Sequence, residues 1–424
     1  MRRLRVWLVA LTLVSAWGLT ATAAPEAPAP DAERLKRLAD EITQQVVKLR
    51  GLALKRPMPR GVLSRQEIRK RLEERLAKEF PRTEIETEGM VLKRLGLIPA
   101  DSDYLKLVLD LLTDQVVGFY DPFRRQLYIA DWMPIDMQRP ALAHEITHGL
   151  QDQHFDLRRF TSGLKGNADR QLARAALVEG DGTGVMLEFA LGVDLGSLPP
   201  GVMAMLKPML QLFSSPTFQK TPRFLREVLV LPYTAGLDFV VALRRRLAWS
   251  KINAFYQNPP ESTEQVLHPE KFLARERPVL ITPRPLQALK GSREVWQDTL
   301  GEAQLRLYLE QHVSKERAAT AAAGWGGDRG VAYQRPGLPG VAVVHCSVWD
   351  GEQDAIEFEE AQAAALAKLA GKPAQASGPA VYPADGGVVY AVERQGSRVV
   401  SGYGVPAAAW GAIVAEVQKS WKVK

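Results

Sequence analysis

Apolar side chains recur at helical spacing through the N-terminal half of this 424-residue chain. An apolar stripe at intervals of three and four residues predicts an amphipathic helix whose apolar face packs on the core. The pattern predicts helices over residues 31–49, 64–79 and 104–117. Ser64 and Glu67 match the capping box that opens the second of these helices. The pattern does not decide whether the N-terminal helices are a prosegment or an N-terminal subdomain.

The spacing changes after the third predicted helix. Residues 116–120 and 126–130 are rich in apolar and aromatic side chains, and Asp121-Pro122 between them is a typical turn. They predict an antiparallel hairpin. Apolar residues at helical spacing then predict a second long helix, after the one that contains residues 140–150, and it begins between Asn167 and Asp169. The sequence therefore predicts a mostly helical region that contains a small sheet.

The composition changes again at Gly324, where a glycine-rich run begins. The pattern after it predicts strands and helices in alternation, at residues 341–348, 352–370, 387–392, 397–402 and 406–421. This order predicts a small α+β domain. No catalytic group of residues stands out in it, so we expect an interaction or stabilising module.

These elements place the chain in the α+β class. We expect a targeting segment at residues 1–23 and an N-terminal helical segment at 24–100. A mostly helical domain with a small sheet should follow at 101–290, and a C-terminal α+β domain at 320–424. The hydrophobic content of 46% and the charged content of 24% are ordinary for a folded domain protein.

The first residues have the features of an export signal. Three arginines within the first five residues precede an apolar run from Val6 to Leu19, and Ala21-Thr-Ala23 fits a cleavage site. We therefore expect an exported protein, periplasmic or secreted. No stable membrane insertion is expected after cleavage, because the apolar run is short for a membrane span. An uncleaved anchor is the alternative.

Charge and cysteine content exclude other classes. The formal net charge is +7, and removal of the three signal arginines leaves +4, which is modest for this length. We therefore expect no nucleic-acid function. Cys346 is the only cysteine in the sequence, so no intrachain disulfide can form. It lies in an apolar stretch that predicts a buried strand, where a cysteine behaves as a small apolar residue. The oligomeric state is left open.

The most specific motif is His-Glu-x-x-His, formed by His144, Glu145 and His148 in a stretch that predicts a helix. Residues four apart share a helical face, so both imidazoles can reach one metal ion. This is the zinc-peptidase arrangement, in which the glutamate acts on water. The pattern can also arise by chance. However, the chain has only six histidines, and three of them lie within eleven positions.

Catalytic zinc usually has a third protein ligand, and two candidates compete. His154 stands where a third histidine falls in the metzincin pattern, but Gln151 replaces the glycine needed for the tight turn. The alternative for His154 is a histidine that caps the helix end or bonds nearby backbone. Glu179 lies on the apolar stripe of the second long helix, where a carboxylate is costly unless it is paired or bound to metal. Its alternative is a helix-end carboxylate that turns to solvent at Gly180. We favour Glu179.

With these residues the chain resembles zinc metallopeptidases of the gluzincin type. It is most similar to uncharacterised exported bacterial proteins that combine His-Glu-x-x-His-x-x-Gln-Asp-Gln with a later Leu-x-Glu-Gly-Asp. The resemblance is strongest between Gly118 and Asp181, and implies a zincin-like fold for residues 101–290. Better-known gluzincins have an aspartate four residues after the glutamate ligand, where this chain has Thr183. Asp181 is a possible substitute that would fix the tautomer of a ligand histidine.

The predicted function is hydrolysis of peptide bonds in a peptide or protein substrate. Zn²⁺ would be held by His144, His148 and Glu179, and Glu145 would accept a proton from the attacking water. Tyr233 and His268 are candidate donors to the developing oxyanion, with a purely structural role as the alternative for each. The predicted hairpin is a candidate substrate edge, and its alternative is a core hairpin without a ligand. Two alternatives stay open: a non-catalytic zinc-binding scaffold or assembly factor with a peptidase fold, and a metal-dependent hydrolase of non-peptide substrates.

Overall fold

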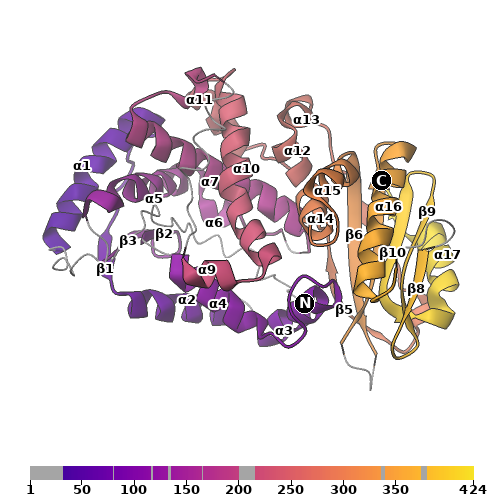
Figure 1. Cartoon of the computed structure of the whole chain (residues 1–424). Helices are drawn as coiled ribbons and strands as arrows, with labels where there is room; N and C mark the ends of the chain where they lie inside the picture. Colours follow the sequence, from indigo (N-terminus) through magenta and orange to yellow (C-terminus); the bar gives the residue numbers. More distant parts are fainter. Residues whose placement is uncertain are drawn as a thin grey trace.

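The computed structural model describes residues 32–79, 81–115, 118–131, 135–164, 166–199, 215–335, 340–373 and 380–424. The predicted targeting segment, residues 1–23, lies outside the described residues. The fold belongs to the α+β class, with a mostly helical part and a part built on a larger sheet (Figure 1). Among the described residues, no helix is long and apolar enough to cross a membrane.

The helical part begins with a run of helices around a small sheet. Its first elements are α1 (Ala32–Arg50), β1 (Arg60–Leu63), α2 (Arg65–Glu79), α3 (Arg82–Arg94), α4 (Tyr104–Gln115), β2 (Gly118–Asp121), β3 (Gln126–Ala130), α5 (Ile135–Phe155), α6 (Leu157–Phe160) and α7 (Ala168–Leu191). It continues with η2 (Leu195–Ser197), α9 (Pro216–Lys220), α10 (Arg223–Arg244), α11 (Trp249–Ile252), η4 (Asn253–Tyr256), α12 (Thr263–Leu267) and α13 (Pro269–Ala274).

Several of the predicted helices and the hairpin are confirmed. The capping box at α2 is formed: the Ser64 backbone N–H donates to Glu67 at 2.8 Å, and the Glu67 N–H donates to the Ser64 hydroxyl at 3.3 Å. β2 and β3 pair in antiparallel fashion, as predicted. β1, which the pattern did not predict, pairs with β3 in parallel, so β2 is an edge strand of the three-stranded sheet. The N-terminal segment is therefore built into this sheet.

Helices α7 and α10 cross with their backbones in contact. A Cβ atom on Gly180 of α7 would lie 2.1 Å from the carbonyl oxygen of Gly236 on α10. Likewise, a Cβ on Gly236 would lie 2.2 Å from the carbonyl oxygen of Ala176. Only glycine permits this approach, because any side chain would displace the neighbouring backbone. The crossing brings α10 against the middle of α7, beside Glu179.

The second part is built on a six-stranded antiparallel sheet with the order β5-β6-β7-β10-β9-β8. Its elements are β4 (Ile281–Thr282), η5 (Gln287–Leu289), β5 (Arg293–Asp298), α14 (Gly301–Leu309), α15 (Lys315–Ala322), β6 (Trp325–Gln334), β7 (Ala342–Trp349), α16 (Glu352–Leu369), β8 (Ala380–Ala384), β9 (Val388–Gln395), β10 (Arg398–Pro406), η6 (Ala407–Ala409), α17 (Trp410–Ser420) and β11 (Lys422–Val423).

Helices cover both faces of this sheet. Successive strand residues point to opposite faces. Val399 packs in one core with α16, whereas Val400 packs in another with α17. The α16 core also contains Leu92 of α3 and Leu112 of α4, so it continues into the helical part. The buried Cys346 of β7 is consistent with its predicted place in a strand.

The six-stranded sheet begins earlier than the sequence pattern indicates. β5 starts at Arg293, before the predicted boundary at residue 320. The glycine-rich run after Gly324 is also part of a strand, β6, which the pattern did not reveal. Close packing explains the glycines: a Cβ on Gly327 would lie 2.2 Å from the Val279 carbonyl oxygen. Glycine weakens the alternation of side chains that predicts a strand.

The two parts meet at the start of α7. The backbone N–H of Ala168 donates to the carboxylate of Asp298 at 2.7 Å, and the N–H of Asp169 donates to the Thr299 carbonyl at 3.1 Å. Both acceptors follow or end β5 of the large sheet. The first turn of α7 is therefore capped by the sheet part, as well as by its own N-cap residue Asn167.

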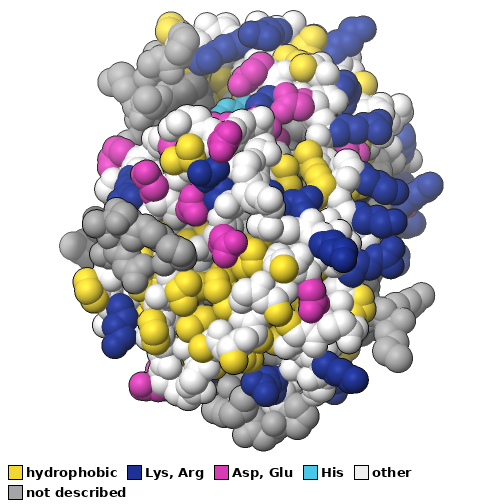
Figure 2. All heavy atoms as spheres, turned by 90° about the vertical axis from the view of Figure 1, so that its right-hand side faces the viewer, with side chains coloured by type: hydrophobic (Ala, Val, Ile, Leu, Met, Phe, Trp, Pro, Cys, Tyr) yellow, Lys and Arg dark blue, Asp and Glu magenta, His cyan; other side chains and the backbone are white. Residues whose placement is uncertain are grey.

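Charge is unevenly distributed on the outer side of the sheet part. Figure 2 views the molecule from the side on which α16 and α17 lie in Figure 1. Lys and Arg side chains gather along the right-hand margin of this view, and hydrophobic side chains gather over its lower half. Other Lys and Arg side chains lie along the top and near the bottom of the same view.

Candidate metal centre

The His-Glu-x-x-His motif lies in the middle of α5, and its two histidines face Glu179 of α7. The side chains of His144, Glu145 and His148 are completely buried. Glu179 lies in the middle of α7 and is 3% exposed. Because α7 continues to Leu191, the alternative in which Glu179 turns to solvent at a helix end is wrong. The two helices hold these polar groups within the protein interior.

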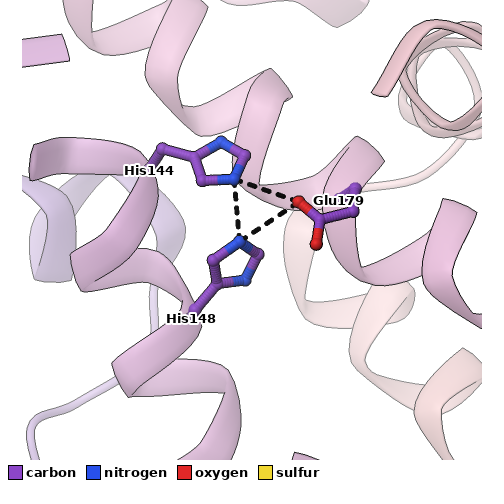
Figure 3. A group of neighbouring side chains, drawn as sticks. All are labelled: His144, His148 and Glu179. Atoms are coloured by element: carbon purple, nitrogen blue, oxygen red, sulfur yellow. Dashed lines mark hydrogen bonds and ion pairs between the residues drawn. The ribbon is translucent and has the colours of Figure 1, made fainter. Parts of the chain in front are cut away.

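Three atoms converge between the helices (Figure 3). The Nε2 atoms of His144 and His148 are 2.8 Å apart. One carboxylate oxygen of Glu179, Oε2, lies 3.1 Å from the first nitrogen and 3.3 Å from the second. Two imidazole nitrogens this close repel each other unless a proton or a cation stands between them. Helical spacing predicted that the two imidazoles converge, and the position of Glu179 on an apolar stripe favoured it as the third group.

The donor set fits a zinc ion. Two imidazole nitrogens and one carboxylate oxygen are typical ligands of a catalytic zinc site. In a tetrahedron with bonds of about 2.0–2.1 Å, the ligand atoms lie about 3.3 Å from one another. The three separations in the protein, 2.8, 3.1 and 3.3 Å, approach this value. Only a small outward movement of the imidazoles is needed to accept the ion.

The three groups determine one another's charge. Burial opposes protonation of His148, but the Glu179 carboxylate outweighs it and raises the pKa of His148 to about 9. Burial and the positive charge on His148 lower the pKa of His144 to about 4. Burial also opposes ionisation of Glu179, yet its partners His148 and His144 lower its pKa to about 2. The site therefore favours one positive charge between the imidazoles.

Glu145 faces the edge strand β2 rather than the Glu179 carboxylate. Its Oε2 accepts a hydrogen bond of 2.7 Å from the backbone N–H of Tyr120. The hydroxyl of Tyr120 donates to Asp152, also on α5, at 2.8 Å. Tyr120 thus contacts α5 at two points, and its backbone N–H holds the Glu145 carboxylate against β2.

The prediction that Asp181 fixes the tautomer of a ligand histidine is wrong. Its two carboxylate oxygens bind the guanidinium of Arg50, at 2.7 and 2.8 Å, and one of them also accepts from the hydroxyl of Tyr256 at 2.8 Å. Arg50 is the last residue of α1 and is 1% exposed. A bidentate arginine and a phenol leave no oxygen of Asp181 directed at an imidazole. Asp181 therefore joins α1 to α7.

The two candidate oxyanion donors lie in different places. Tyr233 of α10 is buried and stacks on His144, with 6.0 Å between ring centroids. It therefore lies at the cluster. His268 lies between α12 and α13, where it contacts Glu302 of α14 at 3.0 Å. It is not among the groups that converge with the two motif histidines. Its contact with Glu302 accounts for the position of the His268 side chain.

His154 does not join the cluster. It lies near the end of α5, and its Nε2 donates to the backbone carbonyl of Ala53 at 2.8 Å. This hydrogen bond to nearby backbone is the alternative that the sequence left open for this histidine. Among the described residues, the group with metal-ligand spacing at this site is His144, His148 and Glu179.

Sequence reasoning missed three residues around the cluster: Arg50, Tyr120 and Gln151. The Gln151 Oε1 atom lies 2.7 Å from Nδ1 of His148. Its position three residues after His148 places both on one helical face, which was a usable signal. Nothing in the local pattern could link Arg50 with Asp181, because 131 residues separate them.

Comparisons with known proteins concern mainly the sheet part. A family model described as a domain of unknown function, DUF8575, matches residues 287–413. This range covers the strands from β5 to β10 and the helices α14 to α16, and it does not reach α5 or α7. No curated protein and no solved structure matches the chain.

Proposed function

We propose that this protein is an exported zinc metallopeptidase with a zincin-like helical part of the gluzincin type. The observation that carries the proposal is the convergence of His144 Nε2, His148 Nε2 and Glu179 Oε2 within 3.3 Å of one another. Glu145, adjacent to the first histidine in sequence, supplies the carboxylate that peptide hydrolysis needs. The N-terminal sequence pattern supports export.

Each residue has a definite task in this proposal. A zinc ion bound by the three ligands would supply Lewis acidity, which polarises a carbonyl and lowers the pKa of water. Glu145 accepts a proton from water and later passes it to the leaving amine. Tyr233, whose ring stacks on His144, is the proposed donor to a developing oxyanion. Burial of the site strengthens these electrostatic interactions.

The edge strand β2 is the proposed place for an extended peptide or protein substrate. An edge strand offers backbone groups that can pair with another chain. Glu145, the proposed proton acceptor, accepts a hydrogen bond from the Tyr120 N–H of this strand. A substrate paired along β2 would thus present its backbone beside Glu145. The modest net charge gives no reason to propose a nucleic-acid partner.

The test is metal analysis of the purified protein together with cleavage of a broad peptide library by wild type and Glu145→Gln. We expect about one zinc per chain in both proteins, because Glu145 is not a ligand in this arrangement. Loss of the proton acceptor should lower the cleavage rate on the order of 10²–10⁴-fold. Equal cleavage by both proteins would refute the mechanism.

The same experiment separates the alternatives. A protein that takes up no zinc on titration would refute the metal site itself. Zinc binding without cleavage of any library peptide would favour a non-catalytic scaffold or assembly factor. Zinc-dependent turnover of ester or amide substrates, but not of peptides, would favour a hydrolase of non-peptide substrates.

A further inference from the structure

Gln151 connects the two helices that carry the proposed ligands. It lies on α5, three residues after His148, and its side chain is completely buried. Its Oε1 atom is 2.7 Å from His148 Nδ1. Its Nε2 atom donates to the backbone carbonyl of Val178 at 3.2 Å. Val178 immediately precedes Glu179, so one carboxamide contacts a ligand on α5 and the neighbour of a ligand on α7.

We infer that Gln151 is a positioning residue that selects the tautomer of His148 and fixes the spacing of the ligand helices. This inference rests on the proposed metal site. It adds a residue that the His-Glu-x-x-His motif and the third ligand do not include. In the sequence, the same position counted only as an obstacle to a metzincin-like turn.

The two hydrogen bonds determine the arrangement of protons. The Val178 carbonyl can only accept, so the NH₂ group of Gln151 must face it, and the amide oxygen must face His148. That oxygen can only accept as well, so Nδ1 of His148 must carry a proton. A neutral imidazole with a proton on Nδ1 has its lone pair on Nε2. Nε2 is the atom that faces His144 and Glu179.

An amide suits this position better than a carboxylate. A carboxylate could accept from Nδ1 but could not donate to Val178, so the contact between the helices would be lost. It would also add a buried negative charge close to Glu145 and Glu179, which is costly. No equivalent residue fixes the tautomer of His144, because among the described residues its buried Nδ1 has no hydrogen-bond partner. The control of ligand tautomer therefore falls on Gln151.

The test compares three variants for zinc affinity, measured by competition with a chromophoric chelator, and for stability of the metal-stripped protein. Gln151→Leu removes the acceptor and the donor. Gln151→Glu restores the acceptor alone. Gln153→Leu is the matched control, because Gln153 is a buried glutamine of the same helix whose Oε1 accepts from the backbone N–H groups of Lys55 and Arg56, at 2.8 and 3.0 Å.

Loss of a hydrogen bond to a ligand histidine typically weakens metal binding 10–100-fold, and we expect a loss in this range for Gln151→Leu. Gln151→Glu should recover most of the affinity while losing stability, and Gln153→Leu should lose stability alone. Unchanged affinity in Gln151→Leu would overturn the inference and leave the metal site intact. Equal losses in Gln151→Leu and Gln151→Glu would overturn the tautomer role, because only Gln151→Glu restores the acceptor for His148 Nδ1. Absence of zinc binding in the wild type would refute the proposed function itself.

Discussion

The close crossing of α7 and α10 gives the sharpest structural prediction. Gly180→Ala places a methyl group 2.1 Å from the Gly236 carbonyl oxygen and 2.2 Å from its carbon. Ordinary contacts of a Cβ atom begin near 3.4 Å. The helices must therefore separate by about 1.3 Å, because both clashing atoms belong to backbone and no side chain can move aside.

The size of the effect follows from two opposing terms. Overpacking of a well-packed core costs typically about 1–3 kcal/mol, and a clash between two backbones belongs at the upper end. Alanine in place of glycine in a helix interior regains about 1 kcal/mol. We therefore expect Gly180→Ala to lower the free energy of unfolding by about 2 kcal/mol. Zinc affinity should fall too, because the displaced backbone adjoins Glu179.

Gly184→Ala is the matched control, since the atoms nearest to the new methyl group would be the Trp249 ring at 3.6 Å and Val240 at 3.9 Å, both ordinary contacts. This variant should gain about 0.5–1 kcal/mol of stability from helix propensity. Urea-induced unfolding of wild type and both variants, with and without zinc, measures the difference. If Gly180→Ala is as stable as Gly184→Ala, the close backbone contact is not a determinant of this fold.

Three other predictions concern the site and its supports. Glu179→Ala should weaken zinc binding sharply and His154→Ala should not, because Glu179, unlike His154, lies within ligand distance of His144 and His148. Chelator competition measures both affinities, and the reverse result would favour a metzincin-like ligand set. Since Glu179 raises the pKa of His148 to about 9, zinc must displace a proton below that pH. Apparent affinity should therefore rise about tenfold per pH unit between about pH 6 and 9, and a flat titration profile would contradict this. Arg50→Met leaves the buried carboxylate of Asp181 without its cation, and should lower the free energy of unfolding in urea by about 3–5 kcal/mol. A loss below about 1 kcal/mol would count against a stabilising role for the Arg50–Asp181 ion pair.

Local signals were sufficient for much of the site. Helical spacing placed His144 and His148 on one face, and the apolar stripe pointed Glu179 toward the same interior. The capping box at Ser64 and the hairpin before α5 could also be predicted, because each depends on residues close together in sequence. The side chains of the cluster could therefore be predicted without knowledge of the packing.

Contacts between distant segments could not be predicted in this way. The pairing of β1 with β3 and the ion pair of Arg50 with Asp181 depend on the packing of α1 against the rest of the helical part. Asp181 was misinterpreted for this reason. Its sequence position suggested an imidazole partner, but its carboxylate binds the buried guanidinium of Arg50 from α1. Similarly, close packing rather than alternation accounts for the glycine-rich strand β6.

The start of α7 limits how far the protein can be divided. The family match begins at residue 287, which marks a unit that sequence comparison can recognise. In the fold, however, Asp298 and Thr299 from that unit accept the first two N–H groups of α7. A fragment that ends before β5 would leave these donors exposed and the helix free to fray from its first turn. Recombination that exchanges the C-terminal unit would therefore succeed only when the incoming unit supplies equivalent acceptors, so the recognisable sequence boundary is not an independent folding boundary.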